Sequence, residues 1–129
     1  MENLTIYKNS VQAHEIDNLC HMNVQYYVKH CIDSYKLNFR IYDLISNYEN
    51  LENNLFLEKI NIRYLNEQRL GTPFLINFYV SKIESEKIIV FLEMENLETT
   101  KISAAFILVF KIKILSKNRK NYDFINSRF

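Results

Sequence analysis

The sequence has no apolar run long enough to span a bilayer, and it contains only one glycine, one proline and two cysteines among 129 residues. The first residues, Met1-Glu2-Asn3, lack the basic stretch that opens a secretory signal. We therefore expect a cytoplasmic protein without a membrane partner, in which the thiols of Cys20 and Cys31 are free. The shortage of glycine and proline accompanies many Asn, Ile, Lys and Tyr residues, which indicates biased codon composition, and we give it no mechanistic weight.

Net charge is also nearly absent, because 16 lysines and arginines face 15 aspartates and glutamates and leave a net charge of +1. This balance gives no whole-molecule indication of nucleic acid or an acidic membrane as a partner. His14 and His30 have no neighbours at metal-ligand spacing, so we expect hydrogen-bonded structural histidines and assign no metal and no cofactor. The length predicts a single domain that spans residues 1–129.

The first half of the chain predicts one strand and one helix. Even spacing of apolar residues predicts a strand over residues 4–13. Over residues 24–35 the apolar positions step by three and four, which is typical of an amphipathic helix, and Asn23 is a good N-cap directly before it. A second helical pattern over residues 41–48 continues this helix or kinks away from it, and residues 46–54 are the predicted loop.

In the second half the period changes to two, which is typical of half-buried strands. The buried face of the first strand is predicted to consist of Phe56, Ile60, Ile62 and Tyr64. After a turn around Gly71, three more strands are predicted at residues 74–83, 87–97 and 102–115. The polar breaks between them are so short that they imply antiparallel neighbours. The basic tail, residues 117–129, is predicted to form a short terminal helix or a frayed end.

This order of elements predicts an α+β fold in which a curved sheet wraps its apolar face around one long helix. A single curved sheet leaves its edge strands unpaired, so we also expect two chains to pair into a longer sheet.

Three polar residues that could carry chemistry, Asp17, His21 and Asn23, lie where the polar loop becomes the helix. A helix N-terminus presents unpaired N–H groups and a partial positive charge, so it can stabilise a carbonyl oxygen or an anion. Each residue also has a structural interpretation: Asp17 as an Asx-turn or cap, His21 as a hydrogen-bonded structural histidine, and Asn23 as an N-cap alone.

The stretch from Asp17 to Tyr27, Asp-Asn-Leu-Cys-His-Met-Asn-Val-Gln-Tyr-Tyr, resembles the signature of hotdog-fold acyl-CoA thioesterases of the 4-hydroxybenzoyl-CoA thioesterase-like group. In that signature an Asp is followed by Gly-His-Met-Asn and then a Tyr. Residues 60–67, which lead to Gly71, are similar to the strand and turn that follow the helix in the same family. The motif is closest to the branch that includes betainyl-CoA thioesterases.

The resemblance implies a hotdog fold: an antiparallel curved sheet around a central helix, with two protomers in one continuous sheet and two active sites at their interface, each near a helix N-terminus. It implies hydrolysis of an acyl-CoA thioester to free acid and coenzyme A, which is part of the substrate and not a cofactor. Asp17 falls on the family's catalytic acid, either as nucleophile or as general base for water. His21 and Asn23 match the polar residues that hold the loop and the substrate, and backbone N–H groups from His21 to Val24 would polarise the carbonyl.

The predicted substrate contacts, beside the catalytic Asp17, His21 and Asn23, are Cys20, Met22, Val24, Tyr27, Tyr64 and Glu67. Cys20 stands where the family has glycine, so it adds a side chain close to the carbonyl and is strained if that position needs a positive φ. This departure keeps open a non-catalytic hotdog that binds acyl-CoA. A hydratase and a thioesterase that acts on acyl carrier protein are two further hypotheses for the same fold.

The state of assembly implied by the resemblance is a homodimer or a dimer of dimers, that is, a homotetramer. The basic residues near the end of the chain either meet the phosphates of coenzyme A or form a solvated strand face and tail. They are Lys111, Lys113, Lys117, Arg119 and Lys120.

Overall fold

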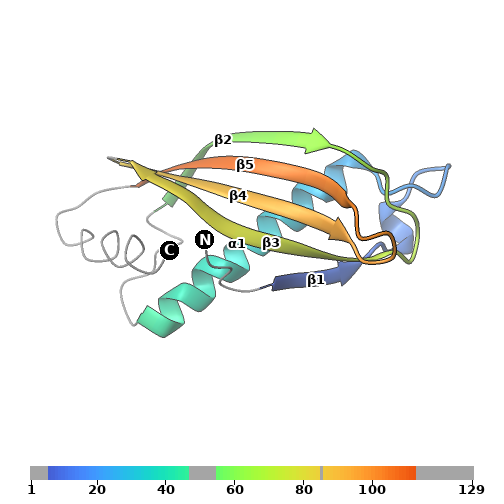
Figure 1. The fold of residues 1–129 in the computed structure, drawn as a ribbon, viewed down its shortest axis with the longest axis horizontal. Coiled ribbons are helices and arrows are strands. Elements are labelled where there is room, and N and C mark those ends of the chain that lie inside the picture. Colours follow the sequence, from blue (N-terminus) through green and yellow to red (C-terminus); the bar gives the residue numbers. More distant parts are fainter. Residues whose placement is uncertain (1–5, 47–54, 85, 113–129) are drawn as a thin grey trace.

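The computed structural model describes residues 6–46, 55–84 and 86–112, which form one sheet, one long helix and a short 3₁₀ helix (Figure 1). The elements β1, η1, α1, β2, β3, β4 and β5 follow one another along the chain. Their bounds are Ile6–Ser10, Ala13–Glu15, Val24–Ser46, Leu55–Tyr64, Pro73–Glu84, Lys87–Asn96 and Ile102–Ile112. The predicted α+β class is confirmed. The predicted loop after Ser46 and the predicted tail lie outside the described residues.

The five strands form a single antiparallel sheet in the order β1-β3-β4-β5-β2. The short polar breaks connect β3 to β4 and β4 to β5, as predicted from their length. β2 pairs with β5 at the far side of the sheet, so β1 and β2 are the two edge strands. β1 is shorter than the predicted strand, because it ends at Ser10 and Ala13 already belongs to η1.

α1 runs along one face of the sheet as one continuous helix of 23 residues, so both predicted helical patterns belong to it up to Ser46 (Figure 1). Its buried face differs from the predicted apolar stripe, because Val24 is 56% exposed whereas His30, Ser34 and Asn38 are buried. A prediction based on apolar residues alone misses polar side chains that are buried together with a hydrogen-bond partner, and His30 is such a side chain. No helix in the described part of the chain is long and apolar enough to cross a membrane.

The core fills the space between α1 and the sheet. Alternate residues of the three central strands are fully buried, among them Phe78 in β3 and Phe106 in β5. The ring of Phe39 in α1 packs edge-on against Phe78 and Phe110, at centroid distances of 5.6 and 5.3 Å. Cys31 is buried in this core as predicted, and burial raises the pKa of its thiol, so the thiol stays protonated and inert.

The buried face of β2 was predicted only in part. Ile60 and Ile62 pack against the core as expected, but Phe56 and Tyr64 are 56% and 45% exposed, and Leu57 packs inward in place of Phe56. The register against β5 shifts between Leu57 and Lys59, which marks a β-bulge. One extra residue in a strand exchanges the two faces on one side of the bulge, so a strict period of two misplaces Phe56.

Candidate active site

The motif residues fold into a short hairpin that stands directly before α1. At its base the Asn23 N–H donates to the Glu15 carbonyl at 2.7 Å, and nearer its tip the Asp17 N–H donates to the His21 carbonyl at 2.9 Å. Asn23 immediately precedes α1, at the predicted N-cap position. Its own carbonyl accepts the Tyr26 N–H at 2.9 Å, while its side chain makes no hydrogen bond to a residue that the structure describes.

The tip of this hairpin is a three-residue loop, residues 18–20, in which Cys20 has a φ of 64°. A type I turn followed by a left-handed residue is a common form of this loop, and glycine favours the left-handed position because it has no Cβ. Cys20 therefore stands at a position that requires a positive φ. Its side chain is exposed and lies outside the cavity described below.

Asp17 has both a structural and an accessible carboxylate oxygen. Its Oδ1 accepts the N–H groups of Leu19 and His21 at 2.8 and 3.2 Å, which is the geometry of an Asx-turn. Its Oδ2 has no hydrogen-bond partner among the described residues. One oxygen of Asp17 thus holds the hairpin, and the other has no hydrogen bond to a described residue.

The hairpin is fixed to the connection between β2 and β3. The Met22 N–H donates to the Gln68 carbonyl at 2.7 Å, and the Leu70 N–H donates to the Cys20 carbonyl at 3.1 Å. The Gln68 N–H in turn donates to the hydroxyl of Tyr27 at 3.2 Å. Gln68 is fully buried, so its hydrogen bonds hold the hairpin in a fixed position against the first turn of α1.

An open cavity of about 470 Å³ lies beside the hairpin, the start of α1 and the end of β2. All the predicted site residues except Cys20 line it: Asp17, His21, Met22, Asn23, Val24, Tyr27, Tyr64 and Glu67. The lining also includes Leu19, Leu65 and Asn66, which were not predicted from the sequence. Their position next to motif residues was the only signal that could have indicated them.

The lining of the cavity combines a contact between an imidazole and a carboxylate, two phenols and an apolar rim. His21 Nδ1 lies 3.1 Å from Glu67 Oε2. The rings of Tyr27 and Tyr64 meet edge-on at 5.3 Å, and burial raises the pKa of both phenols, so both keep their protons at neutral pH. Leu19 is 68% exposed at the rim. Among the described residues, no group of three or more His, Cys, Asp or Glu side chains could hold a metal ion.

The backbone N–H groups expected to polarise a carbonyl are already engaged at three of the four expected positions. The N–H of His21 donates to Asp17, and those of Met22 and Asn23 donate to the Gln68 and Glu15 carbonyls. The first N–H groups of a helix have no carbonyl partner within it. Of the four expected groups, the N–H of Val24 is therefore the one without a hydrogen-bond partner among the described residues.

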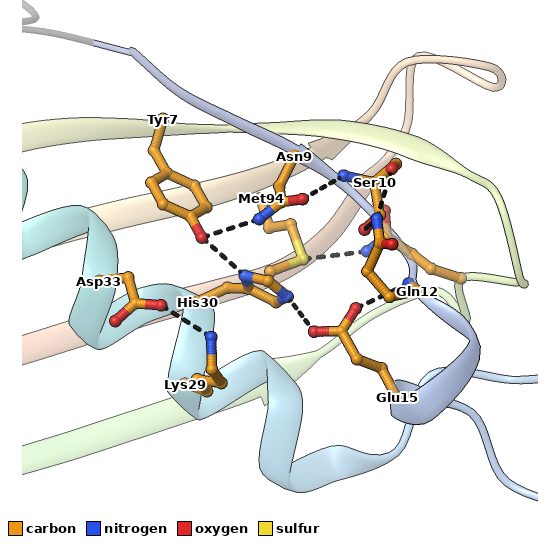
Figure 2. A network of polar contacts seen from close by, with 10 residues as sticks. Tyr7, Asn9, Ser10, Gln12, Glu15, Lys29, His30, Asp33 and Met94 are labelled. Atoms are coloured by element: carbon orange, nitrogen blue, oxygen red, sulfur yellow. Dashed lines mark hydrogen bonds and ion pairs between the residues drawn. The ribbon is translucent and has the colours of Figure 1, made fainter.

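Beneath the hairpin lies a buried network around His30 (Figure 2). His30 Nε2 lies 2.6 Å from Glu15 Oε2, and the hydroxyl of Tyr7 lies 2.8 Å from His30 Nδ1. The predicted role of His30 as a hydrogen-bonded structural histidine is confirmed, and burial lowers its pKa despite the neighbouring carboxylate of Glu15. Glu15 lies outside the motif, and its place in this network had no signal in the sequence.

The helix wrapped by a five-stranded antiparallel sheet, with an acidic hairpin at the helix N-terminus, defines a hotdog-type thioesterase fold. The family model of the thioesterase-like superfamily matches residues 11–119, and the chain belongs to this superfamily. No curated protein matches the sequence.

Solved structures show the same fold. A proposed thioesterase from Pseudomonas putida KT2440 is 16% identical with a TM-score of 0.78, and the match covers 99% of this chain and 88% of that one. A 1,4-dihydroxy-2-naphthoyl-CoA thioesterase from Synechocystis is 16% identical with a TM-score of 0.66, covering 82% and 79%. A Streptococcus mutans UA159 protein bound to acetyl CoA is 16% identical with a TM-score of 0.67, covering 83% and 78%.

Proposed function

We propose that this protein is an acyl-CoA thioesterase that hydrolyses an acyl thioester to free acid and coenzyme A. The observation that carries the proposal is the free Oδ2 of Asp17, in the lining of a cavity at the N-terminus of α1. The other oxygen of the same carboxylate is held by two N–H groups, so the reactive oxygen is oriented before substrate arrives.

The thioester carbonyl would lie with its carbon toward Asp17 and its oxygen toward the N–H of Val24. An N–H group at a helix start stabilises the negative charge that develops on this oxygen. Asp17 then acts in one of two ways. As nucleophile it forms a mixed anhydride that water hydrolyses, and as general base it takes a proton from the attacking water.

The substrate class rests on the motif and on the cavity lining. The stretch from Asp17 to Tyr27 favours the 4-hydroxybenzoyl-CoA thioesterase-like group and its betainyl-CoA branch. The acetyl CoA bound by the Streptococcus mutans protein supports a coenzyme A thioester as the ligand. Cys20 does not argue against activity, because its side chain lies outside the cavity lining.

We also propose that two protomers pair through the free edge of β2. The cavity lies at the end of this strand, where Tyr64 and the following Leu65 are 45% and 47% exposed. A partner strand beside β2 would cover this open side of the cavity and protect the edge. A coenzyme A thioester as substrate, together with the free thiols of Cys20 and Cys31, favours a cytoplasmic location.

The test is hydrolysis of a panel of betainyl, aromatic and short-chain acyl-CoA thioesters, followed with a thiol reagent. The decisive variant is Asp17→Asn, because its amide oxygen can still accept the N–H groups of Leu19 and His21 and so preserve the hairpin. We expect kcat to fall by about a thousandfold or more, as is typical when a reacting carboxylate is lost. Turnover that is unchanged in this variant, or absent in the wild type on every member, would reject the proposal.

Single-turnover hydrolysis in heavy-oxygen water separates the two roles of Asp17. Only the anhydride route can place label in the Asp17 carboxylate, when water attacks the aspartyl carbonyl and the released acid carries away an oxygen of Asp17, whereas the general-base route places label only in the released acid. Mass spectrometry of the peptide that contains Asp17 measures the difference.

A further inference from the structure

The proposed reaction makes no use of the buried hydrogen bond between Glu15 and His30 beneath the hairpin (Figure 2). Glu15 Oε2 lies 2.6 Å from His30 Nε2, and the two side chains are 2% and 1% exposed. The Gln12 N–H donates to the other Glu15 oxygen at 2.8 Å, and the Tyr7 hydroxyl lies 2.8 Å from the other imidazole nitrogen. Every side-chain polar atom of the pair therefore has a partner.

Stability alone is a weak reason for such a pair. Burying a carboxylate and an imidazole costs free energy that their hydrogen bonds only partly offset, and a well-packed apolar pair of similar volume is often as stable. A fully bonded buried pair does fix a geometry, because any displacement leaves a buried polar atom without its partner. The relevant question is which part of the protein depends on the position of Glu15.

Glu15 stands at the base of the hairpin that carries the reactive acid. Its side chain is bound to His30, inside α1, while its backbone carbonyl accepts the Asn23 N–H at 2.7 Å, directly before α1 begins. Asp17 follows two residues later on the same arm of the hairpin. Glu15 thus connects the arm that carries Asp17 to the middle of α1, through His30, and to the start of α1, whose first residue, Val24, lines the cavity.

We propose that Glu15 and His30 are positioning residues that set the placement of Asp17 relative to the N–H of Val24. This inference rests on the proposed function. Neither residue lines the cavity, so both act through Asn23 and the hairpin and not by touching the substrate. Without the bond between Glu15 and His30, the hairpin can tilt relative to α1. The Asp17 carboxylate and the N–H of Val24 can then no longer contact one substrate at the same time.

Tyr7 extends this link to β1. Asn9 donates to the Tyr7 hydroxyl oxygen at 3.1 Å, so the consistent arrangement is that the Tyr7 hydroxyl donates to His30 Nδ1 and His30 Nε2–H donates to Glu15. Burial raises the pKa of Tyr7, which keeps this proton in place. The edge strand, the hairpin and the helix are therefore joined by one chain of hydrogen bonds.

The kinetic test uses Glu15→Gln, which preserves the size of the side chain and removes its charge. We expect kcat to fall by about tenfold or more, since small misplacements of reacting groups have effects of this size, while KM stays within about twofold. The matched control is Phe39→Leu, a core change against Phe78 and Phe110 that lowers the melting temperature without touching the hairpin. Its kcat, measured well below the transition, should equal that of the wild type.

A second measurement does not depend on turnover. Hydrogen exchange of the Asn23 amide, followed by NMR in the ligand-free protein, reports the bond between Asn23 and Glu15 directly. We expect exchange to be about tenfold faster or more in Glu15→Gln and unchanged in Phe39→Leu. If Glu15→Gln does not fold, Tyr7→Phe removes the far end of the same link and should shift both readouts in the same direction, by less.

The outcomes separate this inference from the proposed function. A loss of melting temperature with unchanged kcat and unchanged Asn23 exchange would show that the pair only stabilises the fold, and would overturn the inference. A wild type without turnover would reject the proposed function, while the exchange measurement would still decide whether Glu15 and His30 position the hairpin.

Discussion

Among single residues, Cys20 carries backbone strain beside the candidate site. Its φ of 64° lies in the left-handed region, which costs a residue with a Cβ about 1–2 kcal/mol. The side chain makes no contribution to the cavity that could offset this cost. The strain therefore belongs to the hairpin loop itself, and it can be relieved without touching the reacting groups.

We expect Cys20→Gly to raise the free energy of unfolding by about 0.5–1 kcal/mol, which is the relieved strain minus the larger chain entropy of an unfolded glycine. Urea unfolding measures the change. Cys20→Ala keeps the Cβ and serves as the control, with stability close to that of the wild type. A glycine variant that is less stable than the alanine variant would contradict the left-handed conformation.

Among elements, the network around His30 joins β1, η1 and α1, and it makes their association depend on pH. The pKa of His30 is lowered from 6.5, chiefly by burial. The unfolded chain therefore binds a proton at a pH where the folded protein does not, so the contribution to stability is fully present above pH 6.5 and is lost as pH falls below it. The titratable groups around His30 are Glu15 and Tyr7, which hydrogen-bond to its ring, and Lys29 and Asp33, whose charges also act on its pKa.

We expect the free energy of unfolding of the wild type to fall as pH drops below 6.5, with part of this slope absent in His30→Asn. Urea unfolding at a series of pH values measures both slopes. His14→Asn is the matched control, because the His14 side chain is exposed and its contact is an edge-on one with the ring of Tyr26. Equal slopes in the wild type and in His30→Asn would show that His30 does not bind fewer protons in the folded state.

Most of the fold followed from local periodicity. The helix and all five strands were predicted because their apolar residues recur at 3.6 or two residues, although the first strand was predicted too long. The face of β2 was predicted wrongly at Phe56, because a bulge depends on pairing with β5 and leaves no local mark. The buried face of α1 was missed at His30, whose partner Glu15 is 15 residues away along the chain.

The site was predicted from a contiguous motif, so its side chains were found while their long-range partners were not. Asp17, His21 and Glu67 were named from two stretches and line one cavity, and their chemical roles stay predictions. Nothing in the sequence near Met22 indicated that its N–H group is hydrogen-bonded, because the partner, Gln68, belongs to the connection between β2 and β3. Which backbone donors remain for a ligand is therefore a property of the tertiary structure.

For the whole molecule, the free edge of β2 beside the open cavity indicates where a second protomer would matter most. We expect light scattering at micromolar concentration to give at least twice the protomer mass, and specific activity to fall when dilution separates the protomers. The two curves should coincide, because the partner covers the cavity. A stable monomer with full specific activity would contradict the proposed pairing, and constant activity through dissociation would place the complete site within one chain.

The contact between Gln68 and the first turn of α1 also has a consequence for the order of folding. Gln68 and Tyr27 are separated by 41 residues, whereas Glu15 and His30 are separated by 15. Contacts between distant residues form later, because closing a longer loop costs more chain entropy before any contact is made. On the ribosome, the hairpin and α1 are synthesised before the segment that completes their cavity. We therefore expect a nascent chain to be able to join the hairpin to α1 well before it can bind a ligand.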